Sequence, residues 1–152
     1  MALGVPAIID ALTSKAGALG VFDAVNAHEP KNAPGAGVAC SVWCSKMSPA
    51  PEASGLAVAS VLVEFQMRIY TSMLQEPQDG IEPSVLAAAD LVFTALIGGF
   101  TLGGNVRDVD VFGAHSEGLR AEAGYLNQDG KLFRVMDIHV PMIVSDVHPE
   151  VA

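Results

Sequence analysis

The chain has 152 residues, 17 of them acidic and 8 basic, so its formal net charge is −9. Hydrophobic residues make up 51% and charged residues only 16% of the sequence, which excludes disorder over most of its length and predicts one folded domain over residues 1–152. The basic residues are scattered singly, which argues against nucleic-acid binding, because neutralising phosphates needs clustered Lys and Arg. Since a soluble domain usually carries about 25% charged residues, we expect copies of the chain or partner proteins to cover part of its surface.

The first third of the chain predicts one helix and two strands. The helix spans Val5–Leu19, where apolar side chains recur at the spacing of one helical face. Val21–Ala27 predicts a short strand, and Val38–Ser45, which is rich in β-forming residues, predicts a second. Lys46–Leu56 predicts a loop, because its two prolines cannot donate to a strand ladder.

The range Ala57–Ser72 gives the clearest strand signal, an alternation of apolar and polar side chains over many residues. The apolar face holds Val61, Val63, Phe65, Met67 and Ile69. The opposite face holds Glu64, Gln66, Arg68 and Tyr70. This pattern is typical of a sheet with one buried side.

A second helix is predicted after the loop Leu74–Gly80, with Pro83 at its first position and Gly98 and Gly99 at its end. Its apolar positions form one broad stripe made of Val85, Leu86, Ala89, Val92, Phe93, Leu96 and Ile97. We expect this stripe to be the main cover of the core.

The last third predicts an antiparallel meander of three strands, Val106–Phe112, Leu119–Leu126 and Lys131–Asp146, with a turn at Asn127–Gly130. The last strand is apolar on both faces, so we expect it to lie centrally in the sheet or under another subunit. Pro141 interrupts its ladder, which predicts a change of pairing there. The order of elements favours an α+β fold with two layers, a mostly antiparallel sheet and two helices packed on one face. The face with Glu64 would then lack a helical cover.

Two segments resemble catalytic or phosphate-binding motifs only superficially. Gly113–Gly118 places Ser and His between glycines, but its predicted flanks are strands, whereas a nucleophile elbow joins a strand to a helix, so it predicts a loop. Gly98–Gly104 (GGFTLGG) ends a helix and lacks the Lys-Ser/Thr pair of a phosphate loop.

The titratable residues do not form a recognisable site in the sequence. The histidines, none at a helical i,i+4 spacing, are His28, His115, His139 and His148. A zinc site would need them to meet Cys40 or Cys44 in three dimensions, an alternative that the sequence leaves open. The two cysteines lie about 13 Å apart along a strand, too far for a disulfide, so we expect free thiols and a reducing compartment.

The remaining polar clusters are equally sparse. The acidic pairs Asp108/Asp110 and Glu76/Asp79 fall short of an oxygen cage for a cation. His139 beside Asp137 is more typical of a hydrogen-bonded or interface residue than of a catalyst. The sequence therefore predicts no enzyme activity, no catalytic residue, no metal ligand and no cofactor. It also predicts no secretory signal, because Asp10 interrupts the first apolar stretch and no basic region precedes it. We expect no membrane partner, because the longest uncharged run near the middle, Leu91–Val106, is too short and too rich in glycine to span a bilayer.

From Val61 to Asp146 the chain resembles the tail terminator proteins of long-tailed (siphovirus-type) bacteriophages, in particular those of actinobacterial phages. The similar segments are VLVEFQMRIYTSMLQEP, IEPSVLAAADLVFTALIGGFTLGG, RDVDVFG and LRAEAGYLNQDGKLFRVMDIHVPMIVSD. The helix Val5–Leu19 and the strand after it fit the same scheme. The resemblance rests on the succession of elements and not on catalytic residues.

The resemblance implies a virion protein of the neck and tail, assembled in the host cytoplasm. It implies a ring, usually of six copies, that sits on the head-proximal end of the tail tube, stops tube growth and joins the tail to the head. The partners would be other copies of the chain, the tail tube protein and a head-closure or neck protein. Viral DNA would pass through the lumen without specific binding, since an acidic channel repels the phosphate backbone.

Two alternatives remain open at the level of sequence. One is another neck component, either a head-closure or a head–tail joining protein. The other is a small α+β enzyme or ligand-binding dimer that uses the curved sheet as a pocket floor, with His139, Asp137 and Arg68 inside it. The regular alternation of Glu64, Gln66 and Tyr70 argues against a dry pocket there.

Overall fold

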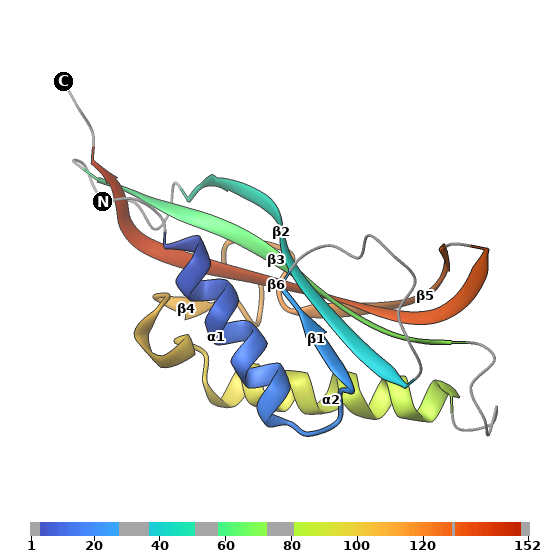
Figure 1. Cartoon of the computed structure of the whole chain (residues 1–152). Helices are drawn as coiled ribbons and strands as arrows, with labels where there is room; N and C mark the ends of the chain where they lie inside the picture. The colour runs from blue at the N-terminus through green and yellow to red at the C-terminus, as the bar shows by residue number, and fades with distance from the viewer. Residues whose placement is uncertain (1–3, 28–36, 51–57, 73–80, 129, 150–152) are drawn as a thin grey trace.

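The computed structural model describes residues 4–27, 37–50, 58–72, 81–128 and 130–149 (Figure 1). Two helices cover a mostly antiparallel sheet, so the predicted α+β fold is confirmed. The elements in chain order are α1 (Val5–Ala18), β1 (Ala24–Asn26), β2 (Val38–Pro49), β3 (Val58–Ser72), α2 (Ile81–Gly98), the 3₁₀ turn η3 (Leu102–Gly104), β4 (Asp108–Val109), β5 (Arg120–Gln128) and β6 (Lys131–Pro149).

The strands form one six-stranded sheet in the order β1-β2-β3-β6-β4, with β5 also paired to β6. All pairs are antiparallel except β1 with β2. β6 lies between β3 and the β4/β5 side, so it has the central position in the sheet that was one of the two expectations for it. Its partner changes at Pro141, as predicted: β5 pairs with β6 as far as His139, and β4 pairs with it from Met142.

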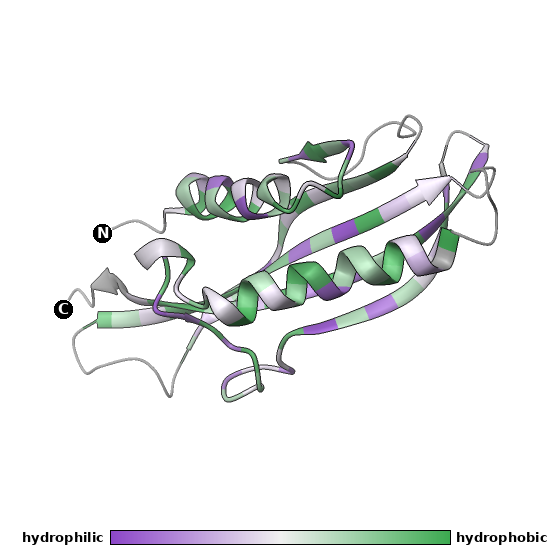
Figure 2. Cartoon of the chain, turned by 90° about the horizontal axis from the view of Figure 1, so that it is seen from below, coloured by the Kyte–Doolittle hydropathy of each residue, from purple (hydrophilic) through white to green (hydrophobic). Residues whose placement is uncertain are grey.

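Both helices lie over one face of the sheet, as the two views in Figures 1 and 2 show. The predicted apolar face of β3 is buried beneath them, together with the matching faces of β2 and β6. From the helices, the side chains that fill this core are Ile8, Leu12, Ala16, Val85, Ala88, Ala89, Val92 and Leu96. Burial of this layer is the main driving force for folding.

The apolar stripe predicted for α2 is only partly correct. Val85 and Leu96 are buried against the sheet, but Leu86 and Ile97 are about half exposed, at 57% and 48%. Leu86 and Ile97 are eleven residues, or three helical turns, apart, so they lie above one another on a flank of α2 that the sheet does not reach. The helix therefore carries more apolar surface than its own core needs.

Two strand boundaries also differ from the prediction. β2 continues to Pro49, beyond a bulge between Cys44 and Lys46, because β3 is long enough to pair with it there. In the range predicted as the strand Val106–Phe112, only Asp108 and Val109 form a ladder with β6. The chain then turns away, since the Asp110 side chain bonds to the loop that follows. The predicted loop Leu74–Gly80 and most of Lys46–Leu56 lie outside the described residues.

The second face of the sheet is not uniformly open, which corrects the expectation for Tyr70. A small cluster on this face buries Ala39, Tyr70, Phe133 and Val135. The Tyr70 and Phe133 rings meet edge to face at 6.3 Å between centroids, and the Tyr70 hydroxyl lies 3.0 Å from the Ser41 hydroxyl. The rest of this face carries half-buried polar side chains.

Ile138 tests the placement of β6. It is fully buried and lies between Met67 of β3 and Ala121 of β5. We expect Ile138→Asp to abolish cooperative folding, because an unpaired buried carboxylate costs several kcal/mol and a domain is stable by only about 5–15 kcal/mol. Ile138→Val is the matched control, with an expected cost of about 0.5–1.5 kcal/mol. Thermal unfolding followed by circular dichroism measures both, and a folded Ile138→Asp protein would contradict this register.

Candidate interaction surfaces

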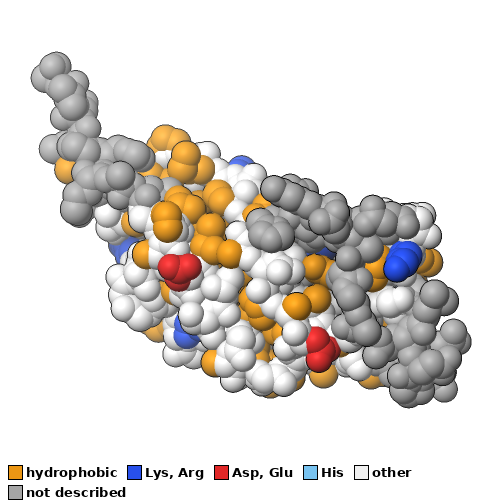
Figure 3. Space-filling model, in the orientation of Figure 1, with side chains coloured by type: hydrophobic (Ala, Val, Ile, Leu, Met, Phe, Trp, Pro, Cys, Tyr) orange, Lys and Arg blue, Asp and Glu red, His pale blue; other side chains and the backbone are white. Residues whose placement is uncertain are grey.

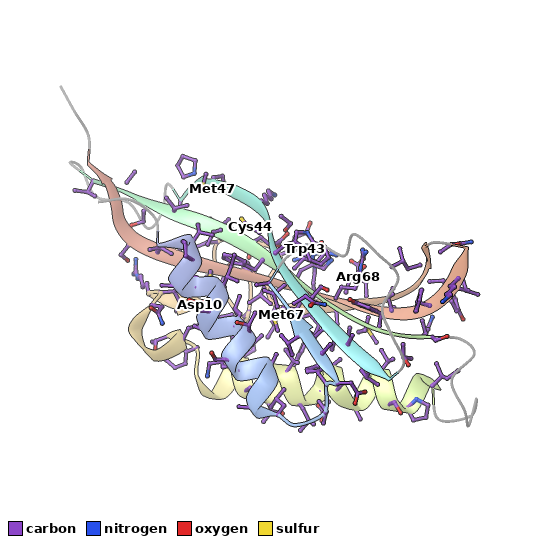
Figure 4. The ribbon with its side chains drawn as sticks, viewed as in Figure 1. Asp10, Trp43, Cys44, Met47, Met67 and Arg68 are labelled. Atoms are coloured by element: carbon purple, nitrogen blue, oxygen red, sulfur yellow. The ribbon has the colours of Figure 1, made fainter. Side chains whose placement is uncertain are left out.

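The polar face of the sheet holds an ion pair between two residues that the sequence offered as pocket groups. Arg68 of β3 and Asp137 of β6 are cross-strand neighbours. The Arg68 guanidinium donates from Nε to Asp137 Oδ1 at 2.7 Å and from Nη2 to Oδ2 at 3.3 Å. It also lies 5.4 Å from the centre of the Trp43 ring, a cation–π contact (Figure 4). Arg68 and Asp137 therefore neutralise each other.

A second group of charges lies further along the same face. Arg120 Nη1 donates to Glu64 Oε1 at 3.2 Å, and Arg120 Nη2 lies 3.3 Å from Glu117 Oε2. His139 Nδ1 is 3.8 Å from Glu64 Oε2, too long for a hydrogen bond, and has no hydrogen-bond partner among the described residues. Glu64 and Arg120, the second of which the sequence did not single out, also line a hollow of about 240 Å³.

The serine and histidine between the two glycines belong to a loop that Asp110 organises. The buried Asp110 carboxylate accepts hydrogen bonds from the backbone N–H groups of Ala114 and His115, at 2.7 and 2.9 Å, and from the Ser116 hydroxyl at 2.7 Å. Ser116 Oγ in turn accepts from the Gly118 N–H at 3.0 Å. The Ser116 hydroxyl is therefore a structural group of the loop, and the hollow gains no evident nucleophile from it.

The loop also requires glycine at Gly118. Its φ is +85°, and an added Cβ would lie 3.0 Å from the Gly113 nitrogen and the Val111 oxygen. Burial raises the pKa of the Asp110 carboxyl, but the bonds from Ser116, His115 and Ala114 outweigh it and hold this pKa below its usual range. We therefore expect the ionised form of Asp110 to fix the shape of the loop.

The same loop displays an aromatic side chain. Phe112 is 98% exposed. Beside it, Ile97 at the end of α2 and Phe100 just after it are each about half exposed. These three side chains line a hollow of about 320 Å³ together with Asp108. We call Ile97, Phe100 and Phe112 the helix–loop patch; such a cluster on a small domain is typical of an interaction site.

A second uncovered surface lies at the other edge of the sheet. β1 pairs with β2 only as far as Ser41, so no described strand pairs with the outer side of β2 beyond that point. Residues 44–48, which we call the β2 edge, are exposed apart from the half-buried Ser48, and Met47 among them is 60% exposed (Figure 4). On the face shown in Figure 3, hydrophobic side chains form a broad band with few charges. Unpaired strand edges of this kind are sites of association.

The structure separates most of the residues considered as metal ligands. Cys40 is buried in the core, whereas Cys44 lies exposed on the β2 edge. His28, Glu76 and Asp79 lie outside the described residues, as does the side chain of His148. In the described ranges, no three His, Cys, Asp or Glu side chains gather closely enough to hold a metal ion. No helix in these ranges is long and apolar enough to cross a membrane.

Comparisons with known proteins do not assign the chain to a family. No known family matches the chain, and no curated protein matches it. Among solved structures, it is similar to a chain of the "Virion of native gene transfer agent (GTA) particle", with a TM-score of 0.45 and 16% sequence identity over 91% of this chain and 96% of that chain. A likeness of this size carries no functional conclusion.

The two thiols should differ sharply in reactivity. Burial raises the pKa of Cys40 to about 12, so its thiolate is scarce and its sulfur is inaccessible, whereas Cys44 is exposed. We expect a thiol reagent to modify one cysteine per chain in the native protein and both in denaturant, as measured by mass spectrometry. If the Cys44→Ser variant is no longer modified in its native state, the modified cysteine of the unsubstituted protein is Cys44. Rapid native modification of Cys40 would contradict its placement in the core.

Asp110→Asn tests the loop. Because the pKa of Asp110 lies below the value of about 3.9 for an unfolded aspartate, the carboxylate stabilises the fold above that pH, and this contribution is lost as the pH falls through the lower folded value. Asn retains one acceptor but directs an NH₂ group at backbone N–H donors, so we expect a loss of about 1–3 kcal/mol near pH 7. Urea unfolding should show a smaller difference from the unsubstituted protein at about pH 3. Asp90→Asn, on the exposed side of α2, is the control; an equal loss there would contradict the assignment.

Proposed function

We propose that this chain is a structural virion protein that forms a ring at the head-proximal end of a phage tail tube, stopping tube growth and joining the tail to the neck. The observation that carries the proposal is the position of its uncovered apolar surface. The β2 edge and the helix–loop patch lie on opposite sides of the sheet, so each copy has two different surfaces to cover (Figure 2).

Two different surfaces on opposite sides of a subunit favour a head-to-tail contact. Such a heterologous contact repeats from copy to copy and closes into a ring when the rotation between copies fits. A self-complementary contact would instead give a dimer and use only one of the two surfaces. The apolar excess of the sequence, 51% hydrophobic against 16% charged, is compatible with contacts between copies.

The polar face of the sheet supports a ligand-binding or enzymatic role less well than the uncovered apolar surfaces support a ring. Arg68 and Asp137 bond to each other, Arg120 is shared by two glutamates, and the Ser116 hydroxyl is held by Asp110. The unbonded His139 Nδ1 is the one feature here that favours a ligand. An active site needs a nucleophile, base or oxyanion donor free to meet a substrate, and these side chains are already bonded within the sheet and loop.

The resemblance of the element order to tail terminator proteins supplies the partners in this proposal. The first partner is the chain itself, in a ring of six copies. The ring would bind the tail tube protein on one side and a head-closure or neck protein on the other. The formal charge of −9 per copy supports passage of DNA through the ring without specific binding. The chain itself contributes structure and no chemistry.

Mass photometry over a range of concentrations, with negative-stain microscopy, tests the proposal. We expect rings, either of the free protein or of a monomer that becomes a ring when purified tail tubes are added. Tubes alone, without the protein, provide the control for the appearance of bare ends. Binding to filled heads but not to tubes would favour the head-closure alternative. A compact dimer that binds a small molecule and leaves tube ends bare would overturn the proposal.

A further inference from the structure

We propose that the β2 edge of one copy docks on the helix–loop patch of the next copy, with Met47 inserted into the hollow lined by Ile97, Phe100 and Phe112. This inference rests on the proposed ring and names its lateral contact. It commits to a second copy of this chain as the occupant of the patch.

The positions of the two surfaces fit a side-by-side contact. The β2 edge lies on the β1 side of the sheet, and Phe112 follows β4 on the opposite side. A head-to-tail contact between neighbouring copies in a ring joins two different surfaces of the subunit, and two opposite edges of one sheet meet that requirement. Seen from below in Figure 2, α1 with β1 and the β5 side form the two opposite margins of the molecule.

The side chains on the two surfaces also lie on the same face of the sheet, the one that the helices cover. Residues paired across strands share a face, and Met47 pairs with Val63, which is buried under the helices. Met47 therefore emerges on the face that the helices cover. Ile97 and Phe100 lie at the end of α2, in that same layer. Two copies with their sheets side by side would thus bring Met47 to the hollow and not to the polar face.

The size and chemistry of the hollow suit this residue. Its volume of about 320 Å³ equals roughly ten water molecules at about 30 Å³ each, enough for a methionine side chain. Methionine is flexible and forms favourable sulfur–aromatic contacts, and the hollow offers two phenylalanine rings, Phe100 and Phe112. Phe112, almost fully exposed in the single chain, would lose most of its contact with water.

The charges of the two surfaces are complementary. Lys46 is the one charged residue of β2, and it is exposed next to Met47. The hollow is lined by Asp108 and by no lysine or arginine, whereas the Asp110 carboxylate beneath it is buried and bonded to the loop. A lysine on the strand edge opposite Asp108 favours this pairing over contact of either surface with itself.

Cross-linking tests the contact directly. In a Cys44→Ser background, where the remaining Cys40 is buried, we introduce Met47→Cys and Phe112→Cys. Mixing the two single variants should give cross-linked dimers, and the double variant should give a ladder of cross-linked copies with a short bis-maleimide. Neither single variant should cross-link with itself, because the contact is head-to-tail. Met47→Cys combined with Tyr125→Cys, an exposed aromatic position on β5, is the matched control.

A second measurement uses charge and packing. Met47→Asp should raise the concentration needed for half-assembly on the order of tenfold, which corresponds to about 1.4 kcal/mol. Lys46→Glu should also weaken assembly, whereas Lys131→Glu, the same change of charge at the hairpin, should leave it within about twofold. All three positions are exposed, and unfolding curves check that the variants keep their stability.

The outcomes separate this contact from the proposed function. Cross-linking of Met47→Cys with Phe112→Cys above the Tyr125 control supports the contact. Rings of the unsubstituted protein with no such cross-link, or rings unaffected by Met47→Asp, overturn the contact and leave the ring proposal intact. Absence of rings both in solution and on tube ends overturns the ring proposal, and the contact with it.

Discussion

The fold is built on the antiparallel pairing of β3 with β6. Its ladder runs from Val58 to Ser72 on one strand and places the alternating apolar residues of both strands on one face. Burial of that face under α1 and α2 requires each residue to keep its register, because a slip of one residue would turn the apolar side chains outward. The outer strands β1, β2, β4 and β5 are arranged around this central pair.

The same constraint leaves surface uncovered. Two helices cover the middle of the sheet, but β2 runs on past the short β1, and α2 carries apolar side chains on a flank that faces away from the sheet. On the polar face, by contrast, the charged groups are satisfied within the chain, as the bidentate contact between Arg68 and Asp137 illustrates. The exposed apolar side chains Met47, Phe100 and Phe112 therefore lie at the margins of the sheet, where such clusters are typical of interaction sites, while His139 Nδ1 on the polar face has no hydrogen-bond partner among the described residues.

Asp110 links the fold to this surface. Its backbone N–H bonds to the Pro141 carbonyl at 2.8 Å, at the point where β6 exchanges β5 for β4 as its neighbour, and its carboxylate gathers the amides of the following loop. The loop then holds Phe112 outward beside the end of α2. A proline that interrupts a ladder, a buried carboxylate and an exposed aromatic residue thus act together to place one of the two proposed contact surfaces.

The sequence predicted the α+β class, the alternation of β3, the two apolar faces of β6 and the change of pairing at Pro141, since these follow from local periodicity and from the missing N–H of proline. It did not determine where β2 ends, because pairing beyond Cys44 depends on the length of β3 and not on the residues of β2. It also assigned Leu86 and Ile97 to the core, although they are about half exposed. Helical periodicity specifies which side chains share a stripe, but only the width of the sheet beneath α2 decides how much of that stripe is buried. The contacts of Asp110 and the meeting of Ile97, Phe100 and Phe112 likewise depend on segments that tertiary packing brings together.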